Sequence, residues 1–91
     1  MDGVGVIMTA ADLITPAGYA AAVTPSDTDN LAQITRKIYI GGTGNLAVIM
    51  TGDVTNTPVV FSALPVGTVL DIRVKRVMST DTTATNIVAL W

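Results

Sequence analysis

The chain has 91 residues, enough for one domain with a modest hydrophobic core. It contains no His and no Cys, which excludes a His-based general base, a thiol nucleophile, a disulfide and a zinc finger. Its seven acidic residues, all Asp, outnumber five Lys and Arg, so the net charge of −2 argues against a nucleic-acid partner. No apolar run reaches 18 residues, so we expect no membrane-spanning helix.

The residue types favour strands over helices. Val, Ile and Thr make up 34 of the 91 residues, and these β-branched side chains fit a pleated sheet better than a helix. The content of hydrophobic residues is 49% and the mean hydropathy is +0.56, which is high for a small monomer with much surface. Burial against other subunits is the simplest explanation, so we predict a homo-oligomer.

Residues 1–18 are rich in Gly, Ala and Thr and are predicted to form an N-terminal arm, in which Val4–Met8 is able to pair as a strand. No Lys or Arg precedes Arg36, so we expect no secretory signal. Residues 19–91 are predicted to form a single β domain whose first strand is Tyr19–Val23. The polar segment Thr24–Asn30 follows as a turn, in which Asp27 or Asp29 either caps a helical turn over residues 30–34 or, less plausibly without any Glu, binds calcium.

The middle of the chain predicts a hairpin. Thr35–Ile40 alternates as a strand, and Leu46–Met50 is a strand with apolar residues on both faces. The glycine-rich segment Gly41–Asn45 between them is expected to supply the positive φ angles of a hairpin loop. It does not match a phosphate-binding loop, because the G-x-x-x-x-G-K-[ST] pattern is missing.

The second half of the chain predicts three more strands. Pro58 precedes the short strand Val59–Phe61, and Thr68–Met78 is the clearest alternating strand. The alternation slips at Lys75–Val77, where a bulge would turn Arg76 away from the core. Asn86–Trp91 is again apolar on both faces. Two-faced apolar strands are either covered sheet centres or subunit contacts. The predicted fold is all-β, a small antiparallel β-sandwich or barrel of about six to eight short strands.

No catalytic or cofactor site is predicted. A G-x-S-x-G elbow is missing, and Asp residues scattered over turns are typical of solvated loops. We therefore expect no enzyme, no metal and no cofactor. All five positive charges lie in two clusters, which either pair with Asp71 and other Asp residues across strands, dock on an acidic partner, or contact nucleic acid. Trp91 either closes the core or anchors a neighbouring subunit. The candidate interface residues are Arg36, Lys37, Arg73, Lys75, Arg76, Leu46, Val48, Met50 and Trp91.

Three blocks of sequence together resemble a known family. They are Ala22–Asp27 (AVTPSD), Thr35–Val48 (TRKIYIGGTGNLAV), and Ile72–Val77 (IRVKRV) continuing through Thr80–Thr85 to Ile87–Trp91. In this order they resemble the head-spike base proteins of gene transfer agents and related tailed phages of alphaproteobacteria, over roughly residues 19–91. The matched positions are Pro25, Ser26, Asp27, Arg36, Gly41, Gly42, Gly44, Leu46, Gly67, Arg73, Lys75, Arg76, Thr80, Thr82, Thr83 and Trp91.

The resemblance implies a structural virion protein on the capsid exterior. Members of that family sit at capsid vertices, contact the major capsid protein and carry a spike fibre. It implies a protein assembled in the host cytoplasm into a homo-oligomer, for which a pentamer is favoured and a trimer is possible. The alternative functions are a glycan-binding module of a fibre, which would need exposed aromatic residues, and a tail or baseplate adaptor.

Overall fold

The computed structural model describes residues 16–91, which form seven β-strands and no helix. The strands are β1 (Ala20–Ala22), β2 (Lys37–Gly42), β3 (Gly44–Met50), β4 (Val59–Leu64), β5 (Val69–Leu70), β6 (Val74–Val77) and β7 (Thr85–Leu90). They make two antiparallel sheets, with the strand orders β1-β7-β2-β5 (sheet one) and β4-β3-β6 (sheet two). The prediction of an all-β fold with short antiparallel strands is therefore confirmed.

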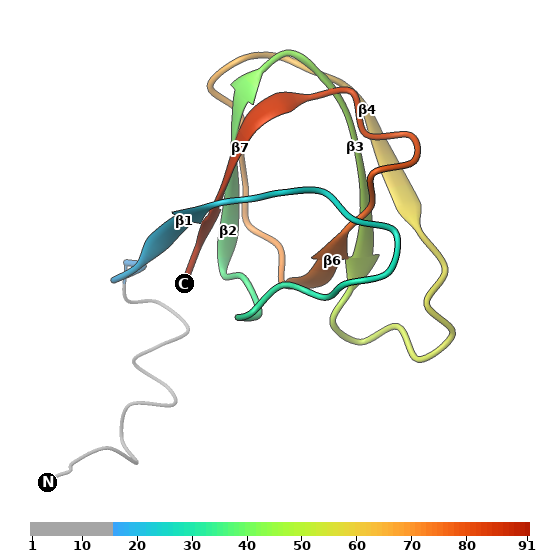
Figure 1. Ribbon diagram of the computed structural model, residues 1–91. Helices are drawn as coiled ribbons and strands as arrows, with labels where there is room; N and C mark the ends of the chain where they lie inside the picture. Colours follow the sequence, from blue (N-terminus) through green and yellow to red (C-terminus); the bar gives the residue numbers. More distant parts are fainter. Residues whose placement is uncertain (1–15) are drawn as a thin grey trace, which may run out of the picture.

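The hydrophobic core lies between the two sheets, which face each other in Figure 1. Both sheets contribute inward side chains, as do the segments that join them. The buried core cluster consists of Ile38, Ile40, Leu46, Val48, Val74, Val77, Ala84 and Ile87. On β2 the predicted alternation holds, because Ile38 and Ile40 are buried while Tyr39 between them is exposed.

Strand β3 explains one of the two-faced apolar patterns in the sequence. It is the central strand of sheet two, with β4 on one side and β6 on the other. Its residues Leu46–Ile49 are all buried within this chain. The unbroken apolar run therefore reflects a sheet centre that is covered on both faces.

The predicted hairpin between β2 and β3 is wrong, because the two strands belong to different sheets. The glycines between them permit a close approach to residues 83–86, and a positive φ is not involved. A Cβ on Gly44 would lie 2.5 Å from the backbone nitrogen of Ala84, and one on Gly41 would lie 2.6 Å from the carbonyl oxygen of Asn86. Among the described glycines only Gly67 has a positive φ, of 86°.

The predicted strand Thr68–Met78 is two strands in the structure. Val69–Leu70 pairs with β2 in sheet one, and Val74–Val77 pairs with β3 in sheet two, so residues 71–73 cross between the sheets. The predicted bulge is present. Val77 and Arg76 pair with successive residues of β3, whereas the next pair joins Val74 to Met50, which leaves Lys75 as the extra residue.

The segment before β2 is irregular, with bends and no helical turn, so the expected helical turn over residues 30–34 is wrong. Its backbone donors serve β6 instead, because the Ser26 N–H donates to the Val77 carbonyl and the Leu31 N–H donates to the Lys75 carbonyl. The predicted first strand is confirmed in the shorter form β1, which pairs with β7. Most of the predicted arm, including Val4–Met8, lies outside the described residues.

Candidate assembly surface

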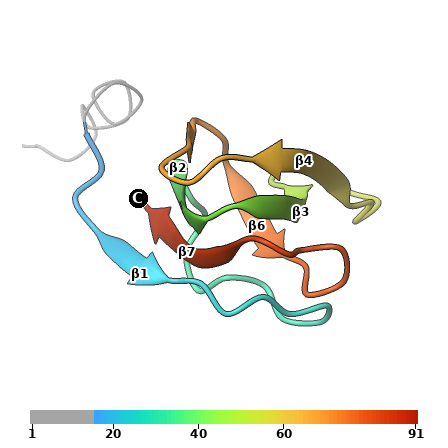
Figure 2. The ribbon, with the colours of Figure 1, turned by 90° about the horizontal axis from the view of Figure 1, so that it is seen from above.

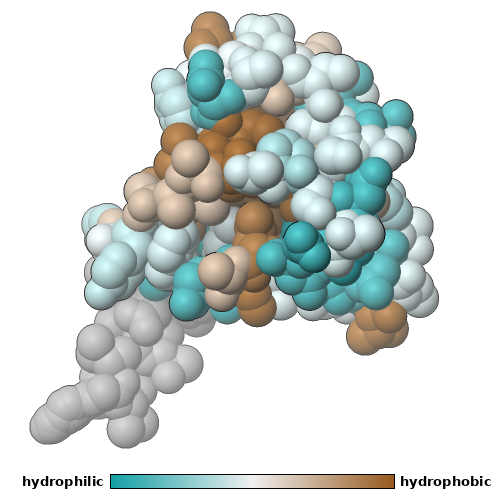
Figure 3. Space-filling model, viewed as in Figure 1, coloured by the Kyte–Doolittle hydropathy of each residue, from teal (hydrophilic) through white to brown (hydrophobic). Residues whose placement is uncertain are grey.

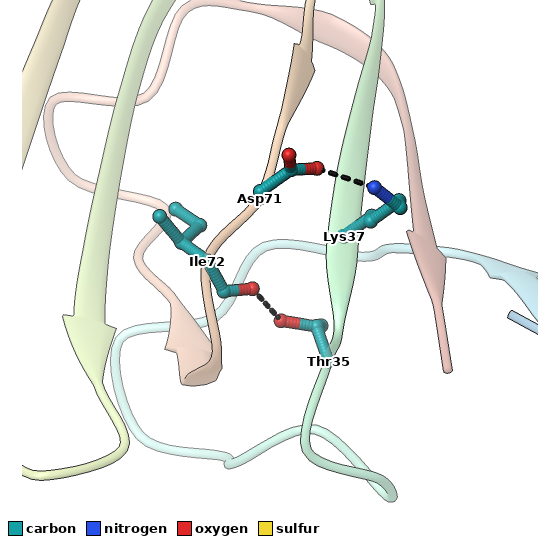
Figure 4. A network of polar contacts seen from close by, with 4 residues as sticks. All are labelled: Thr35, Lys37, Asp71 and Ile72. Atoms are coloured by element: carbon teal, nitrogen blue, oxygen red, sulfur yellow. Dashed lines mark hydrogen bonds and ion pairs between the residues drawn. The ribbon is translucent and has the colours of Figure 1, made fainter. Parts of the chain in front are cut away.

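Thr35 holds the segment before β2 against the crossing between β5 and β6. Its side chain is 1% exposed, and its hydroxyl donates to the Ile72 carbonyl (2.9 Å) and accepts from the Val74 N–H (3.0 Å). The Thr35 N–H also donates to the Val74 carbonyl (3.3 Å). Figure 4 shows that this contact places the two segments side by side. Two segments far apart in the sequence are thereby held together.

The contact at Thr35 brings the segment that contains Arg36 and Lys37 next to the segment that contains Arg73. The ammonium group of Lys37 forms an ion pair with Asp71 at 2.6 Å, which confirms cross-strand pairing with Asp71 for this residue (Figure 4). The Arg36 N–H donates to the Leu90 carbonyl at 2.7 Å and ties the segment to β7. The side chain of Arg73 is exposed and makes no hydrogen bond or ion pair within residues 16–91. We call Arg36, Lys37 and Arg73 the basic corner.

The other two basic residues make contacts within the chain. The Lys75 ammonium group donates to the backbone carbonyl of Asp53 at 2.7 Å. The Arg76 guanidinium donates to the Asn30 side chain at 2.9 Å and to the Asp27 carbonyl at 3.2 Å. The bulge places both side chains outside the core, where they fix two loops to β6. The five predicted interface cations therefore divide into two groups with different surroundings.

The carboxylate of Asp27 joins two loops by hydrogen bonds. It accepts from the Ser79 N–H (3.0 Å) and from both the N–H (2.9 Å) and the hydroxyl (2.6 Å) of Thr80. The Thr80 hydroxyl and then its N–H lower the pKa of Asp27 below the ordinary value of 3.8, because they stabilise the ionised carboxylate. Hydrogen bonds from Thr55 likewise lower the pKa of Asp53. Asp27 thus connects distant loops and does not cap a helical turn.

The apolar interface candidates lie in different surroundings. Leu46 and Val48 are fully buried in the core of this chain, so they are left out of the surface proposed below. Met50 is half-buried and packs against the core. Trp91 is half-buried and stacks on Tyr19, with ring centroids 5.9 Å apart, where β7 meets β1. Tyr19 itself is 69% exposed.

Sequence reasoning missed several exposed apolar side chains, above all those of β4. Val59 and Val60 are 46% and 41% exposed, and Val54 in the preceding loop is 91% exposed. A signal for them exists in the sequence, because residues 54–70 carry no charged side chain. Within the described residues no three His, Cys, Asp or Glu side chains are grouped to hold a metal ion. No helix long and apolar enough to span a membrane occurs there either.

The described residues form a small all-β protein with exposed apolar side chains and a basic corner on its surface. No protein-family model and no curated protein matches the chain. A search of solved structures finds a chain from the "Capsid of native GTA particle computed with C5 symmetry", where GTA stands for gene transfer agent. That chain is 30% identical, the match covers 100% of both chains, and the TM-score is 0.78.

The protein is therefore a virion structural protein, and it belongs to the family of capsid-associated proteins of gene transfer agents and phages. The family places it in the virion, in association with a capsid. Its structural neighbour is a chain of a symmetric capsid particle, which is consistent with an oligomeric protein that associates with a capsid.

Proposed function

We propose that this chain is a spike base or decoration protein on the capsid exterior at the vertices, where it links the major capsid protein to a head spike fibre. The observation that carries the proposal is the full-length match, at 30% identity, to a chain of a GTA capsid solved with C5 symmetry. The three sequence blocks that resemble head-spike base proteins add the more specific role. Assembly in the host cytoplasm is part of the proposal.

In the proposed role the chain forms a ring of five copies. A capsid vertex has fivefold symmetry, and a ring that matches it presents five equal contacts to the capsid below. The C5 symmetry applied to the neighbour's particle supports this number over a ring of three. The apolar content of 49% supports burial between copies.

The basic corner is the proposed contact with the major capsid protein. The side chain of Arg73 is exposed and makes no hydrogen bond or ion pair within residues 16–91, so its guanidinium group is available to a partner. Arg36 and Lys37 lie in the segment that Thr35 joins to residues 72 and 74, although Asp71 offsets the charge of Lys37. An acidic patch on the capsid would complement this surface. Such rim charges mainly affect the rate of association and its dependence on salt.

Imaging of labelled particles tests the proposed location. Particles carrying a peptide tag on this chain are labelled with gold-conjugated antibody and imaged by electron microscopy. We expect label at the capsid vertices, together with loss of the vertex spikes in particles that lack the chain. Label on the tail would instead support a tail adaptor. Spikes retained without the chain would refute the link between capsid and fibre.

A further inference from the structure

Two strand edges of the described chain are open, and they lie on opposite sides of the molecule. β1 ends sheet one and β4 ends sheet two, and each pairs with a single neighbour. Figures 1 and 2 show β1 and β4 at opposite sides in two perpendicular views. The remaining edges differ. β6 is bordered by the segment that donates from Ser26 and Leu31, and β5 has only two residues and is followed by Asp71.

The hydrogen bonds of β1 show which peptide groups are available. Tyr19 and Trp91 exchange two backbone hydrogen bonds, and the Val23 N–H donates to the Ile87 carbonyl. Bonding alternates along an antiparallel pair, so the peptide groups of Ala20 and Ala22, which lie between these positions, point away from β7. All three residues of β1 are exposed. A further strand is therefore able to pair along this edge.

Neither edge carries the charges that usually prevent strand pairing. The sequence has no charged residue between Asp12 and Asp27, around β1, nor between Asp53 and Asp71, around β4. Soluble proteins commonly block open edges with charged residues, especially Lys, because an open neutral edge pairs with other chains. Two neutral edges can meet without burying an unpaired charge, whereas a charged partner segment would find no counterion on either edge.

The exposed apolar side chains supply the area that the short strand β1 lacks. A stable interface buries about 800 Å² per partner, more than a three-residue strand offers. Tyr19 lies next to β1, Val54 lies in the loop before β4, and Val59 and Val60 lie in β4, so half of the eight large exposed apolar residues flank the two edges. In Figure 3 hydrophobic side chains gather over β1 and the adjoining part of β7.

From these observations we propose that β1 of one copy pairs edge to edge with β4 of the next copy. The two edges differ, so the contact is head-to-tail, and a head-to-tail contact closes a ring when its rotation fits. This inference rests on the proposed ring and names its interface. The occupant of each edge is a second copy of this chain, and the partner contributes the strand that each edge lacks.

Two single-edge variants of the full-length chain test the proposal. Ala22→Lys places a charge on the β1 edge, and Val60→Lys places one on β4. Val66→Lys is the matched control, because Val66 is 63% exposed in the turn before β5 and lies on neither edge. We expect the wild type and Val66→Lys to have a mass several times 9.4 kDa by light scattering. Each edge variant alone should be monomeric, with self-association at least about tenfold weaker.

Mixing the two edge variants distinguishes a head-to-tail contact from other arrangements. Each variant retains one intact edge, so an equimolar mixture should form dimers and nothing larger. Dimer formation also shows that both variants are folded, and their thermal unfolding provides an independent check. The proposal is overturned if each variant still forms rings, if the mixture stays monomeric, or if the wild type is monomeric at all concentrations.

The failure of this interface and the failure of the proposed function give different results. If the wild type binds capsids and both edge variants still form rings, the β1–β4 contact is refuted and the virion role stands. If the wild type forms rings that the edge variants do not form, but the wild type does not bind capsids, the contact is supported and the docking role is refuted.

Discussion

Replacement of Thr35 by Val removes the hydroxyl that joins the segment before β2 to the crossing between β5 and β6. The two side chains have nearly the same shape, so the change leaves no cavity. The Val74 N–H, a buried donor, loses its acceptor, and the half-buried Ile72 carbonyl loses a donor. A buried polar group left unsatisfied costs about 1–3 kcal/mol, and the carbonyl recovers part of its loss from water.

We therefore expect Thr35→Val to lower the free energy of unfolding by about 2 kcal/mol, of which the Val74 N–H accounts for most. For a domain of this size, that change lowers the melting temperature by roughly 8–16 °C. Thr35→Ser is the matched control. It keeps both hydrogen bonds and loses one buried methyl group, at a cost of about 1 kcal/mol.

Thermal and urea unfolding followed by the fluorescence of Trp91 measure both variants. The protein concentration is held fixed, because self-association raises the apparent stability. We expect the valine variant to be less stable than the serine variant. If Thr35→Val is as stable as Thr35→Ser or more so, the hydroxyl is not what holds these segments together.

Three further outcomes follow from contacts described above. Gly44→Ala should cost about 1–3 kcal/mol in denaturant unfolding, because its Cβ would meet the backbone of Ala84, whereas Gly52→Ala, with nothing within 4 Å, should be nearly neutral. Asp27→Asn should destabilise the protein at pH 7, and the difference in melting temperature from the wild type should shrink as the pH falls through and below 3.8. Hydrogen bonds lower the pKa of Asp27 in the folded state, so its carboxylate stabilises the protein at a pH above the unfolded-state pKa. This stabilisation is lost as the carboxylate of the folded protein becomes protonated. A difference in melting temperature that stays unchanged at low pH would contradict this prediction. Arg73→Glu should weaken binding to capsids in a sedimentation assay about tenfold at low salt and less at high salt, and Arg73→Lys is the charge-retaining control. Equal binding by the wild type and both variants would show that the basic corner is not part of the docking site.

The sequence predicted the strands better than it predicted their partners. Alternation in Thr35–Ile40 and the slip at Lys75–Val77 are local features, so β2 and the bulge in β6 were found from the pattern alone. The hairpin prediction failed because Gly41–Asn45 reads locally as a turn, while the reason for its glycines lies in residues 83–86. Alternation also continues through residues 71–73, where the chain changes sheets, and nothing local marks that crossing.

The candidate site shows the same division between local and distant information. The pairing of Lys37 with Asp71 was among the predicted alternatives, because both residues were placed on predicted strands and carry opposite charges. The full burial of Leu46 and Val48 was left open by the sequence, since a two-faced apolar strand suits a sheet centre and a subunit contact equally well. The open edges of β1 and β4 depend on strand order, which an amino-acid pattern does not encode.

The pairing of β1 with β7 has a consequence for the timing of assembly. Ala20 lies opposite Leu90 and Ala22 lies opposite Val88, so within residues 16–91 strand β1 gains its only neighbour from residues synthesised almost seventy positions later. Pairing between segments so distant in the sequence forms more slowly than local structure does. Under the proposed β1–β4 contact, a nascent or truncated chain has no ordered β1 edge to present, and only a chain that has paired β1 with β7 is competent to join its neighbours. The same contact would exclude incomplete copies from the ring without a separate quality-control step.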